Sequence, residues 1–293
     1  MSARTILRSG ALKLHLLPGV GGSIARFDRI VGGQRQALLR GTDRDYAGVL
    51  DMACFPLVPF CNRIQAGTFQ CDGRVVRLTP NMAPDPSPLH GQGWLSAWQV
   101  ESAREDHATL AFRHEADEWP WDYEARLSFD LDPAGLTVRL ACRNHSDARM
   151  PCGLGLHPYF PCDARTVLDT RVECVWTVDE HVLPVAREAA EGRYDLRRRG
   201  ICGQALDNGF GGWSGAAELA WPDEGLSLRL SSPGCAYFQV YAPREGGLFV
   251  AEPVQHANAA LNEPQEEWES LGVVTLDPGQ ERTLLARFDV TER

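Results

Sequence analysis

The dominant pattern in this chain is an alternation of apolar and polar residues with a period of two. Successive side chains of a β-strand point to opposite faces of a sheet, so each alternating run predicts a half-buried strand. Turn sequences such as Asp132-Pro133-Ala134-Gly135 and Asp277-Pro278-Gly279 separate the runs. The clearest runs are Ala11–Leu17, Asp122–Asp130, Gly135–Arg143, Gly225–Ser231, Ala236–Tyr241 and Thr283–Val290.

Long amphipathic helices are missing from the pattern. Only Pro264–Leu271 could form more than one helical turn, and strands do not alternate with helical stretches as a doubly wound or (β/α)₈ fold requires. We therefore expect an all-β fold, an antiparallel sandwich or barrel with few short helices. Phe69–Leu78, centred on Asp72-Gly73, predicts a hairpin. No linker, repeat or low-complexity tract interrupts the chain, so residues 1–293 are expected to form a single domain.

Composition restricts the partners. The 29 Lys and Arg residues against 39 Asp and Glu residues give a formal charge of −10, which argues against a nucleic acid. No apolar run approaches the ~18–20 residues that cross a bilayer, and the N-terminus lacks a signal pattern, so we expect a cytoplasmic protein without a membrane partner. The nine cysteines include no Cys-x-x-Cys pair, so most are expected to be buried, reduced thiols.

Two histidines and one carboxylate lie among small or apolar residues. His90 belongs to a Leu-His-Gly-Gln-Gly-Trp segment, His157 precedes Pro-Tyr-Phe, and Glu252 lies near the end of an apolar run. An imidazole with a carboxylate can move two protons near neutral pH, and burial would raise the pKa of such a carboxyl group. Taken alone, His90 between glycines fits a structural role better, His157 fits either role equally, and Glu252 favours catalysis.

Other residues around these three suit a polyhydroxylated ligand. Asn62 and Arg63 end a strand-like run, where adjacent side chains point to opposite faces and one of them could reach a cleft; a surface Arg with a turn-capping Asn is the structural alternative. The proline-rich loop Thr79–Pro88 leads directly to the segment that carries His90. Trp94 offers an indole face to a sugar, and Trp98, Tyr159 and Phe160 are further aromatic candidates.

Four short motifs in a fixed order resemble the aldose 1-epimerase (galactose mutarotase) family over about residues 10–290. They are Asn62-Arg63-Ile64 with Gly67 and Phe69, Leu89-His90-Gly91 with Trp98, His157-Pro158-Tyr159-Phe160, and Glu252-Pro253 with Asn262. The resemblance implies a large antiparallel β-sandwich, the galactose mutarotase-like supersandwich, with few short helices. It also implies interconversion of the α and β anomers of a free aldose without a cofactor or a metal ion.

The resemblance implies a role for each candidate residue. Glu252 would be the general base at the C1 hydroxyl, His157 the general acid at the ring oxygen, and His90 the residue that holds the reacting oxygens. The substrate-binding candidates are Asn62, Arg63, Asp207 and Trp94. The Gly-Gln-Gly-Trp after His90 and the Pro after Glu252 depart from galactose-type members and resemble a broader bacterial group with varied substrates.

We expect a neutral monosaccharide as the substrate and a monomer or homodimer as the assembly. A hexose-6-phosphate or another anionic sugar is the alternative substrate, and it would require a second basic residue, for which Arg74, Arg77 and Arg244 are candidates. A sugar-binding module without catalysis is the alternative outside enzymology, although such a module has no need of the His157 and Glu252 pair.

Overall fold

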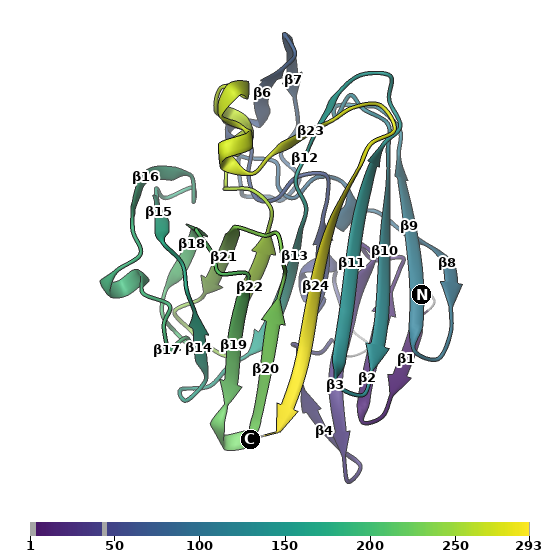
Figure 1. Ribbon diagram of the computed structural model, residues 1–293, viewed down its shortest axis with the longest axis vertical. Coiled ribbons are helices and arrows are strands. Elements are labelled where there is room, and N and C mark those ends of the chain that lie inside the picture. The colour runs from purple at the N-terminus through teal and green to yellow at the C-terminus, as the bar shows by residue number, and fades with distance from the viewer. Residues whose placement is uncertain (1–3, 43–45, 293) are drawn as a thin grey trace.

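The computed structural model describes residues 4–42 and 46–292. Two large sheets, in which every paired strand is antiparallel to its neighbour, dominate the described chain (Figure 1). In spatial order, the 11-stranded sheet holds β1 (Thr5–Ser9), β2 (Leu12–Leu17), β3 (Ser23–Val31), β5 (Cys54–Leu57), β13 (Gly155–Pro161), β22 (Leu248–Val254), β21 (Tyr237–Ala242), β18 (Leu206–Gly211), β15 (Cys174–Val178) and β16 (Pro184–Ala189), with β4 (Gln34–Ala37) paired to β3.

The second sheet packs against the first. In spatial order its nine strands are β17 (Arg199–Gly200), β14 (Val167–Thr170), β19 (Ala216–Trp221), β20 (Leu226–Ser231), β24 (Glu281–Glu292), β11 (Gly135–Asn144), β10 (Tyr123–Asp132), β9 (His107–His114) and β8 (Gln99–Ala103). Two small sheets pair β12 (Met150–Cys152) with β23 (Val274–Leu276) and β6 (Thr68–Cys71) with β7 (Arg74–Arg77). The predicted all-β sandwich is confirmed.

The helices of the described chain are all single 3₁₀ turns. They are η1 (Val49–Asp51), η2 (Gln65–Gly67), η3 (Gly93–Leu95), η4 (Gly192–Tyr194), η5 (Pro222–Glu224), η6 (Ala260–Asn262), η7 (Gln265–Glu267) and η8 (Glu269–Leu271). The expected helix over Pro264–Leu271 is thus two successive short turns, η7 and η8. None of these described helices is long and apolar enough to cross a membrane.

The period-two prediction holds because one face of each strand packs between the two sheets. On β10, the buried residues Tyr123, Ala125, Leu127 and Phe129 alternate with more exposed ones, as the sequence predicts for a strand with one solvated face. The predicted hairpin at Asp72-Gly73 is confirmed as the turn between β6 and β7. Both turn residues have positive φ, 48° and 77°, as a two-residue type I′ turn requires.

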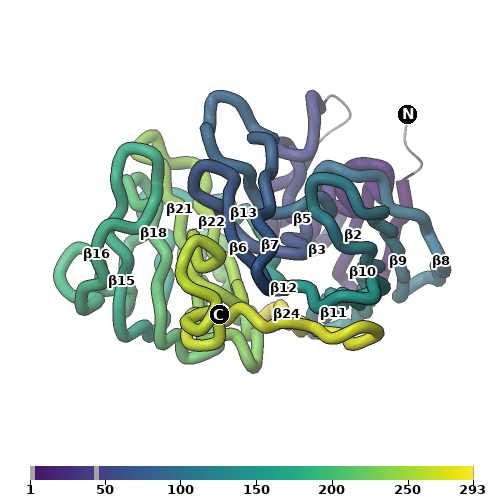
Figure 2. The backbone as a smooth tube through the Cα atoms, turned by 90° about the horizontal axis from the view of Figure 1, so that it is seen from above, coloured from purple at the N-terminus to yellow at the C-terminus, as the bar shows by residue number. Residues whose placement is uncertain are grey.

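The centre of the 11-stranded sheet is buried on both faces. On β13, Leu156 and Phe160 point into the core between the two sheets, whereas Tyr159 belongs to a separate apolar cluster on the outer face. Loops between β3 and β8 build that outer cluster and cover the sheet. Figure 2 shows this chain segment, in blue, on the side of β5, β13 and β22 opposite to β24 and β11. A sheet buried on both faces explains the nearly continuous apolar sequences of β13 and β22.

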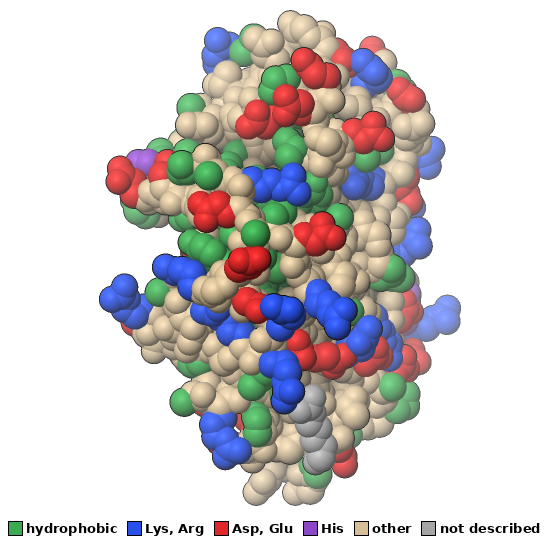
Figure 3. All heavy atoms as spheres, turned by 60° about the vertical axis from the view of Figure 1, so that its left-hand side comes forward, with side chains coloured by type: hydrophobic (Ala, Val, Ile, Leu, Met, Phe, Trp, Pro, Cys, Tyr) green, Lys and Arg blue, Asp and Glu red, His purple; other side chains and the backbone are tan. Residues whose placement is uncertain are grey.

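Charges of both signs occur together on the face of the molecule that carries β15 and β16. Figure 3 shows acidic and basic side chains interspersed on the face that carries β15 and β16, with hydrophobic side chains exposed between them. The net charge of −10 therefore produces no continuous acidic surface on this face.

Candidate active site

A cavity of ≈ 240 Å³ lies on the outer face of the 11-stranded sheet, between the sheet and its covering loops. Loops and five different strands contribute to its wall. The seven residues expected to act in catalysis or substrate binding all line the cavity: Asn62, Arg63, His90, Trp94, His157, Asp207 and Glu252. Seven further residues complete the wall: Leu50, Phe55, Met82, Leu89, Tyr159, Gln239 and Tyr241.

His157 and Glu252 face each other across two neighbouring strands. Gly155 on β13 pairs with Val254 on β22, and Tyr159 pairs with Val250, which places His157 opposite Glu252 between these pairs. Directly opposed side chains in an antiparallel sheet start about 5 Å apart at their Cβ atoms. The side chains approach each other further, and His157 Nε2 lies 3.6 Å from Glu252 Oε1.

Glu252 is buried, and His157 is largely buried, with 12% of its side chain exposed. Glu252 is 3% exposed, and its Oε2 atom has no hydrogen-bond partner among the described residues; the same is true of His157 Nδ1. Burial raises the pKa of Glu252 well above its ordinary value, and the Asp207 carboxylate raises it further while Arg63 opposes the shift. Burial lowers the pKa of His157 to about 3, and the Arg40 guanidinium lowers it as well. The site therefore favours the uncharged form of each group.

His90 is fixed by reciprocal hydrogen bonds to the backbone of Asn62. The His90 N–H donates to the Asn62 carbonyl at 3.0 Å, and the Asn62 N–H donates to His90 Nδ1 at 3.0 Å. Because Nδ1 accepts, the proton of a neutral His90 ring resides on Nε2. Burial lowers the pKa of His90 well below its ordinary value, and the neighbouring His157 and Arg63 act in the same direction. His90 is thus a neutral ring with one N–H left to donate.

The backbone at His90 has little room. His90 itself has a φ of 59°, and Gly91 follows with a φ of 70°. A Cβ atom at Gly91 would lie 2.2 Å from the Val58 carbonyl oxygen, so this position accepts only glycine. The left-handed turn aims the imidazole at His157, with the two ring centroids 5.6 Å apart and the rings nearly perpendicular at 82°.

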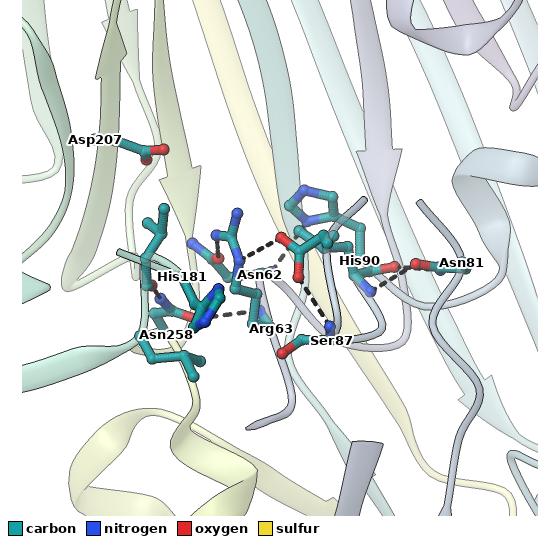
Figure 4. A network of polar contacts seen from close by, with 12 residues as sticks. Asn62, Arg63, Asn81, Ser87, His90, His181, Asp207 and Asn258 are labelled. Atoms are coloured by element: carbon teal, nitrogen blue, oxygen red, sulfur yellow. Dashed lines mark hydrogen bonds and ion pairs between the residues drawn. The ribbon is translucent and has the colours of Figure 1, made fainter. Parts of the chain in front are cut away.

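Arg63 is held by three hydrogen bonds, which Figure 4 shows with its neighbours. Its Nε–H donates to Asp85 Oδ2 at 2.8 Å, its Nη1 donates to Asn62 Oδ1 at 3.0 Å, and its backbone N–H donates to Asn258 Oδ1 at 3.1 Å. Asp85 is itself oriented, because its Oδ1 accepts the Ser87 N–H at 2.9 Å. An acidic partner at this distance balances the charge of the guanidinium before any ligand binds.

The expectation that Asn62 and Arg63 point to opposite faces of a strand is wrong. Strand β5 ends at Leu57, and Asn62 lies beyond it in irregular backbone with a φ of 58°. The strict alternation of a strand does not apply in such a segment, and both side chains line the cavity. The loop Thr79–Pro88 carries Asp85 and thereby contributes to the site, as its place before His90 suggests.

Asp207 lies in the opposite wall. In Figure 4, Asp207 and His90 are on either side of Arg63. Asp207 Oδ1 accepts a hydrogen bond of 3.0 Å from Gln239 Nε2, and Gln239 pairs with Glu252 in the register of β21 and β22. Burial raises the pKa of Asp207, whereas Arg63 and the hydrogen bond from Gln239 lower it.

Aromatic rings pack against both histidines. Phe55 stacks on His157 with ring centroids 4.5 Å apart, and Trp94 meets His90 edge-to-face at 5.6 Å. The Trp94 Nε1–H donates to the Leu89 carbonyl at 3.1 Å, and the side chain is only 1% exposed. Of the other aromatic candidates, Tyr159 lines the cavity, whereas Trp98 and Phe160 belong to the core between the sheets.

Several residues of the site were missed by sequence reasoning. Phe55 and Gln239 have no motif of their own, and only strand register brings them to the cavity. Asp85 also lacks a motif, and loop geometry brings it to Arg63. His256 is buried: the Cys61 N–H donates to its Nε2 at 2.9 Å, and its Nδ1 lies 2.7 Å from the Ala257 carbonyl. The basic candidates Arg74, Arg77 and Arg244 are exposed and do not line the cavity.

A half-buried cation, Arg40, nevertheless lies near the cavity wall. The guanidinium of Arg40 lies 3.7 Å from the centre of the Tyr159 ring, and its Nη2 donates to the Met52 carbonyl at 2.6 Å. Over residues 4–42 and 46–292, no three His, Cys, Asp or Glu side chains are grouped as a metal site. The cavity thus combines an opposed acid–base pair, a neutral imidazole donor, a charge-balanced arginine and an aromatic support.

Comparison with known proteins identifies the family of the chain. The family model described as aldose 1-epimerase matches residues 11–288. The uncharacterized protein YphB of Escherichia coli strain K12 is 32% identical over 245 residues, which cover 80% of this chain and 82% of the relative. A crystal structure of a candidate aldose 1-epimerase from Escherichia coli K12 is 29% identical, with a TM-score of 0.91 and 99% of both chains covered.

A more distant structure shares the fold. The crystal structure of a galactose mutarotase-like protein from Clostridium acetobutylicum has a TM-score of 0.86 at 17% identity and covers 98% of this chain and 95% of its own. The predicted supersandwich is therefore confirmed as the fold. The match of the family model over nearly the whole length shows that the chain belongs to the aldose 1-epimerase family.

Proposed function

We propose that this protein is a cofactor-free mutarotase that interconverts the α and β anomers of a free, neutral monosaccharide. The observation that carries the proposal is the opposed pair of His157 and Glu252, 3.6 Å apart in the wall of a cavity of ≈ 240 Å³. Sites for drug-sized ligands run to roughly 300–1,000 Å³, so a smaller cavity suits one sugar ring better than a chain of them.

The pair needs one proton to catalyse anomer exchange. Burial disfavours a lone carboxylate at Glu252 and a lone imidazolium at His157, so the two groups together hold a single proton. The working state places that proton on His157. In this state the two opposite charges stabilise each other at 3.6 Å.

The reaction then proceeds in two mirrored halves. The Glu252 carboxylate accepts the proton of the C1 hydroxyl while His157 Nε2 gives its proton to the ring oxygen, and the bond between C1 and the ring oxygen breaks. The open sugar is an aldehyde, and rotation about its C1–C2 bond presents the other face of C1. On closure, His157 takes back the proton of the attacking hydroxyl and Glu252 returns its proton to O1. Protons and charge balance over the cycle, and each positioned acid or base contributes about 10²–10⁴-fold.

His90 is proposed to stabilise the oxygen on which charge develops. Its neutral ring can donate only through Nε2, because Nδ1 already accepts the Asn62 N–H. A donor fixed before the reaction requires little reorganisation when charge forms. The unpaired Oε2 of Glu252 and the polar atoms of Arg63, Asn62 and Asp207 offer hydrogen bonds to sugar hydroxyls.

The charge balance of the cavity favours a neutral sugar. Arg63 is the only Lys or Arg among the described lining residues, and it already faces Asp85 at 2.8 Å. Glu252 and Asp207 add carboxyl groups to the same wall. A phosphate or sulfonate would therefore enter a site without an unbalanced cation in its wall.

Exchange spectroscopy by NMR on a panel of free monosaccharides tests the proposal. We expect the protein to accelerate exchange between the α and β signals of at least one neutral aldose at catalytic concentration. A preference for anionic sugars that weakens steeply with added salt would contradict the neutral assignment. Binding without accelerated exchange across the panel would identify a sugar-binding module instead.

A further inference from the structure

Two of the nine cysteines differ from the rest in exposure. Seven are buried, whereas Cys162 and Cys202 are partly exposed. These two partly exposed thiols are also neighbours, because both residues are hydrogen-bonded to Gly247. Cys162 follows directly after β13, and Cys202 lies in the turn between β17 and β18, so the pair joins two segments that are far apart in sequence.

Gly247, just before β22, holds both cysteines in place. Its carbonyl accepts the Cys162 N–H at 3.1 Å, and its N–H donates to Cys202 Sγ at 3.3 Å. The preceding Gly246 has a φ of 70°, and a Cβ atom there would lie 2.9 Å from Cys202 Sγ. One backbone turn thus fixes the position of the Cys162 main chain and of the Cys202 sulfur together.

We propose that Cys162 and Cys202 form a reversible disulfide and are a modification site for small disulfide oxidants such as oxidised glutathione. The pair is accessible to the oxidant because both side chains reach the surface. The two side chains are neighbours at one backbone turn, which is the placement that a disulfide requires.

The chemistry is two successive thiol–disulfide exchanges. The Cys202 thiolate attacks one sulfur of oxidised glutathione, which forms a mixed disulfide and releases one glutathione thiolate. The Cys162 sulfur then attacks Cys202 Sγ, the protein disulfide forms, and the second glutathione leaves. Two protein thiols lose two electrons and two protons, and one glutathione disulfide becomes two glutathione thiols.

The roles of the two sulfurs follow from their surroundings. The N–H of Gly247 donates a hydrogen bond to Cys202 Sγ, and we assign Cys202 as the attacking sulfur. Burial and the neighbouring Cys202 raise the pKa of the Cys162 thiol, so Cys162 is a poor first nucleophile near neutral pH. Cys162 acts in the second step, in which the mixed disulfide is held next to it.

The link is expected to stabilise the fold without changing the site. It ties the end of β13 to the segment that enters β18, and it closes the loop that contains β14 to β17. A loop of this length removes chain entropy from the unfolded state, so Tm should rise by at least about 4 °C. His157 lies five residues before Cys162, about 16 Å along an extended strand, so anomer exchange should change less than about twofold.

The chain contains its own control. Cys142 on β11 and Cys152 on β12 are also neighbours, since Cys152 raises the pKa of Cys142. Both are almost completely buried, with exposures of 0% and 1%. A small oxidant cannot reach these two thiols in the folded protein. Cys142 and Cys152 should therefore form no disulfide, although they are neighbours.

Peptide mapping of the full wild-type chain tests the proposal. The folded protein is incubated with oxidised glutathione, its free thiols are alkylated, and non-reduced peptides are identified by mass spectrometry. We expect a Cys162–Cys202 link that dithiothreitol reverses, alkylation of Cys142 and Cys152 only after unfolding, and a higher Tm of the oxidised protein. In C162S and C202S the oxidant should no longer raise Tm.

Three results would overturn the proposal: both thiols alkylated after oxidation, a glutathione adduct on Cys202 that never resolves, or equal linkage of Cys142 with Cys152. The wild-type peptide map decides the question even if a serine variant fails to fold. Because the readout is a covalent link, it is independent of whether the protein is a mutarotase.

Discussion

His157 Nε2 lies 3.6 Å from Glu252 Oε1, and each side chain also has a buried polar atom without a hydrogen-bond partner among the described residues. An unpaired buried polar atom destabilises the folded protein, so a purely structural role does not explain the presence of both groups. A bound sugar would instead supply hydrogen-bond partners for these atoms through a hydroxyl group and its ring oxygen. The catalytic account rests on this relationship.

Replacing His157 by Asn should remove the general acid. Asn keeps polar atoms in place but cannot exchange a proton near neutral pH, so the rate of anomer exchange should fall at least about 10²-fold. Optical rotation decay of a freshly dissolved anomer measures this rate. His181→Asn, at an exposed histidine outside the cavity wall, is the matched control and should keep the wild-type rate. An unchanged rate in His157→Asn would remove this residue from the mechanism.

Asp85→Asn should weaken the binding of substrate through Arg63. The substitution keeps the shape of the side chain but removes the charge that holds Arg63 Nε at 2.8 Å. A hydrogen bond to a charged group contributes about 1.5–3 kcal/mol, so KM should rise about 10-fold while kcat changes little. The control is Asp72→Asn, which removes the carboxylate partner of Arg149 at 2.6 Å on the β6–β7 hairpin. If kcat falls and KM stays constant, Asp85 acts on the chemical step and the positioning role is wrong.

The rate should depend on pH through the single proton of the His157 and Glu252 pair. Addition of a second proton inactivates the pair, and burial lowers the pKa of His157 to about 3, so activity should persist well into the acid range. Loss of the single proton inactivates the pair at alkaline pH. Burial raises the pKa of Glu252, so the alkaline decline of the rate moves to higher pH. A pH profile of kcat/KM measures both limbs. A decline centred near pH 6.5 would show an ordinary histidine and contradict the account.

His256 should make the fold sensitive to acid. Burial lowers its pKa from 6.5 to about 4 in the folded state, so the unfolded chain binds more protons between these values and stability falls as pH drops through this window. At pH 5 this one group removes about 2 kcal/mol of unfolding free energy relative to neutral pH. His256→Gln should lose that part of the pH dependence while its oxygen can still accept the Cys61 N–H. Urea unfolding at pH 7 and pH 5 measures the difference, and an unchanged pH dependence in the variant would contradict it.

Much of the fold follows from local chemistry. The alternation over β10 and β11 reflects strands with a solvated face, and the positive φ of Asp72 and Gly73 is what an Asp-Gly pair supplies in a tight hairpin. Pro264–Leu271 differs because its weak helical pattern lacks an apolar stripe long enough to sustain an α-helix. It forms two 3₁₀ turns instead.

The site is less accessible to sequence reasoning. Glu252 could be predicted because an acid inside an apolar strand demands an explanation, and the motifs place His90 and His157 beside it. Gln239 could not be predicted, because only the register of β21 with β22 brings it next to Glu252. The same holds for Asp85, which depends on the path of a loop, and for the neighbouring positions of Cys162 and Cys202, which lie on two distant segments.

The most direct test of the account is anomer exchange by Glu252→Gln, measured by NMR next to the wild-type protein on the same aldose. The amide has nearly the shape of the carboxyl group but cannot accept the C1 proton, so exchange should fall at least about 10²-fold. The folded structure and Tm should be retained, because the variant removes a buried ionisable group. A folded Glu252→Gln protein that exchanges anomers at the wild-type rate would contradict the central claim that Glu252 is the catalytic base.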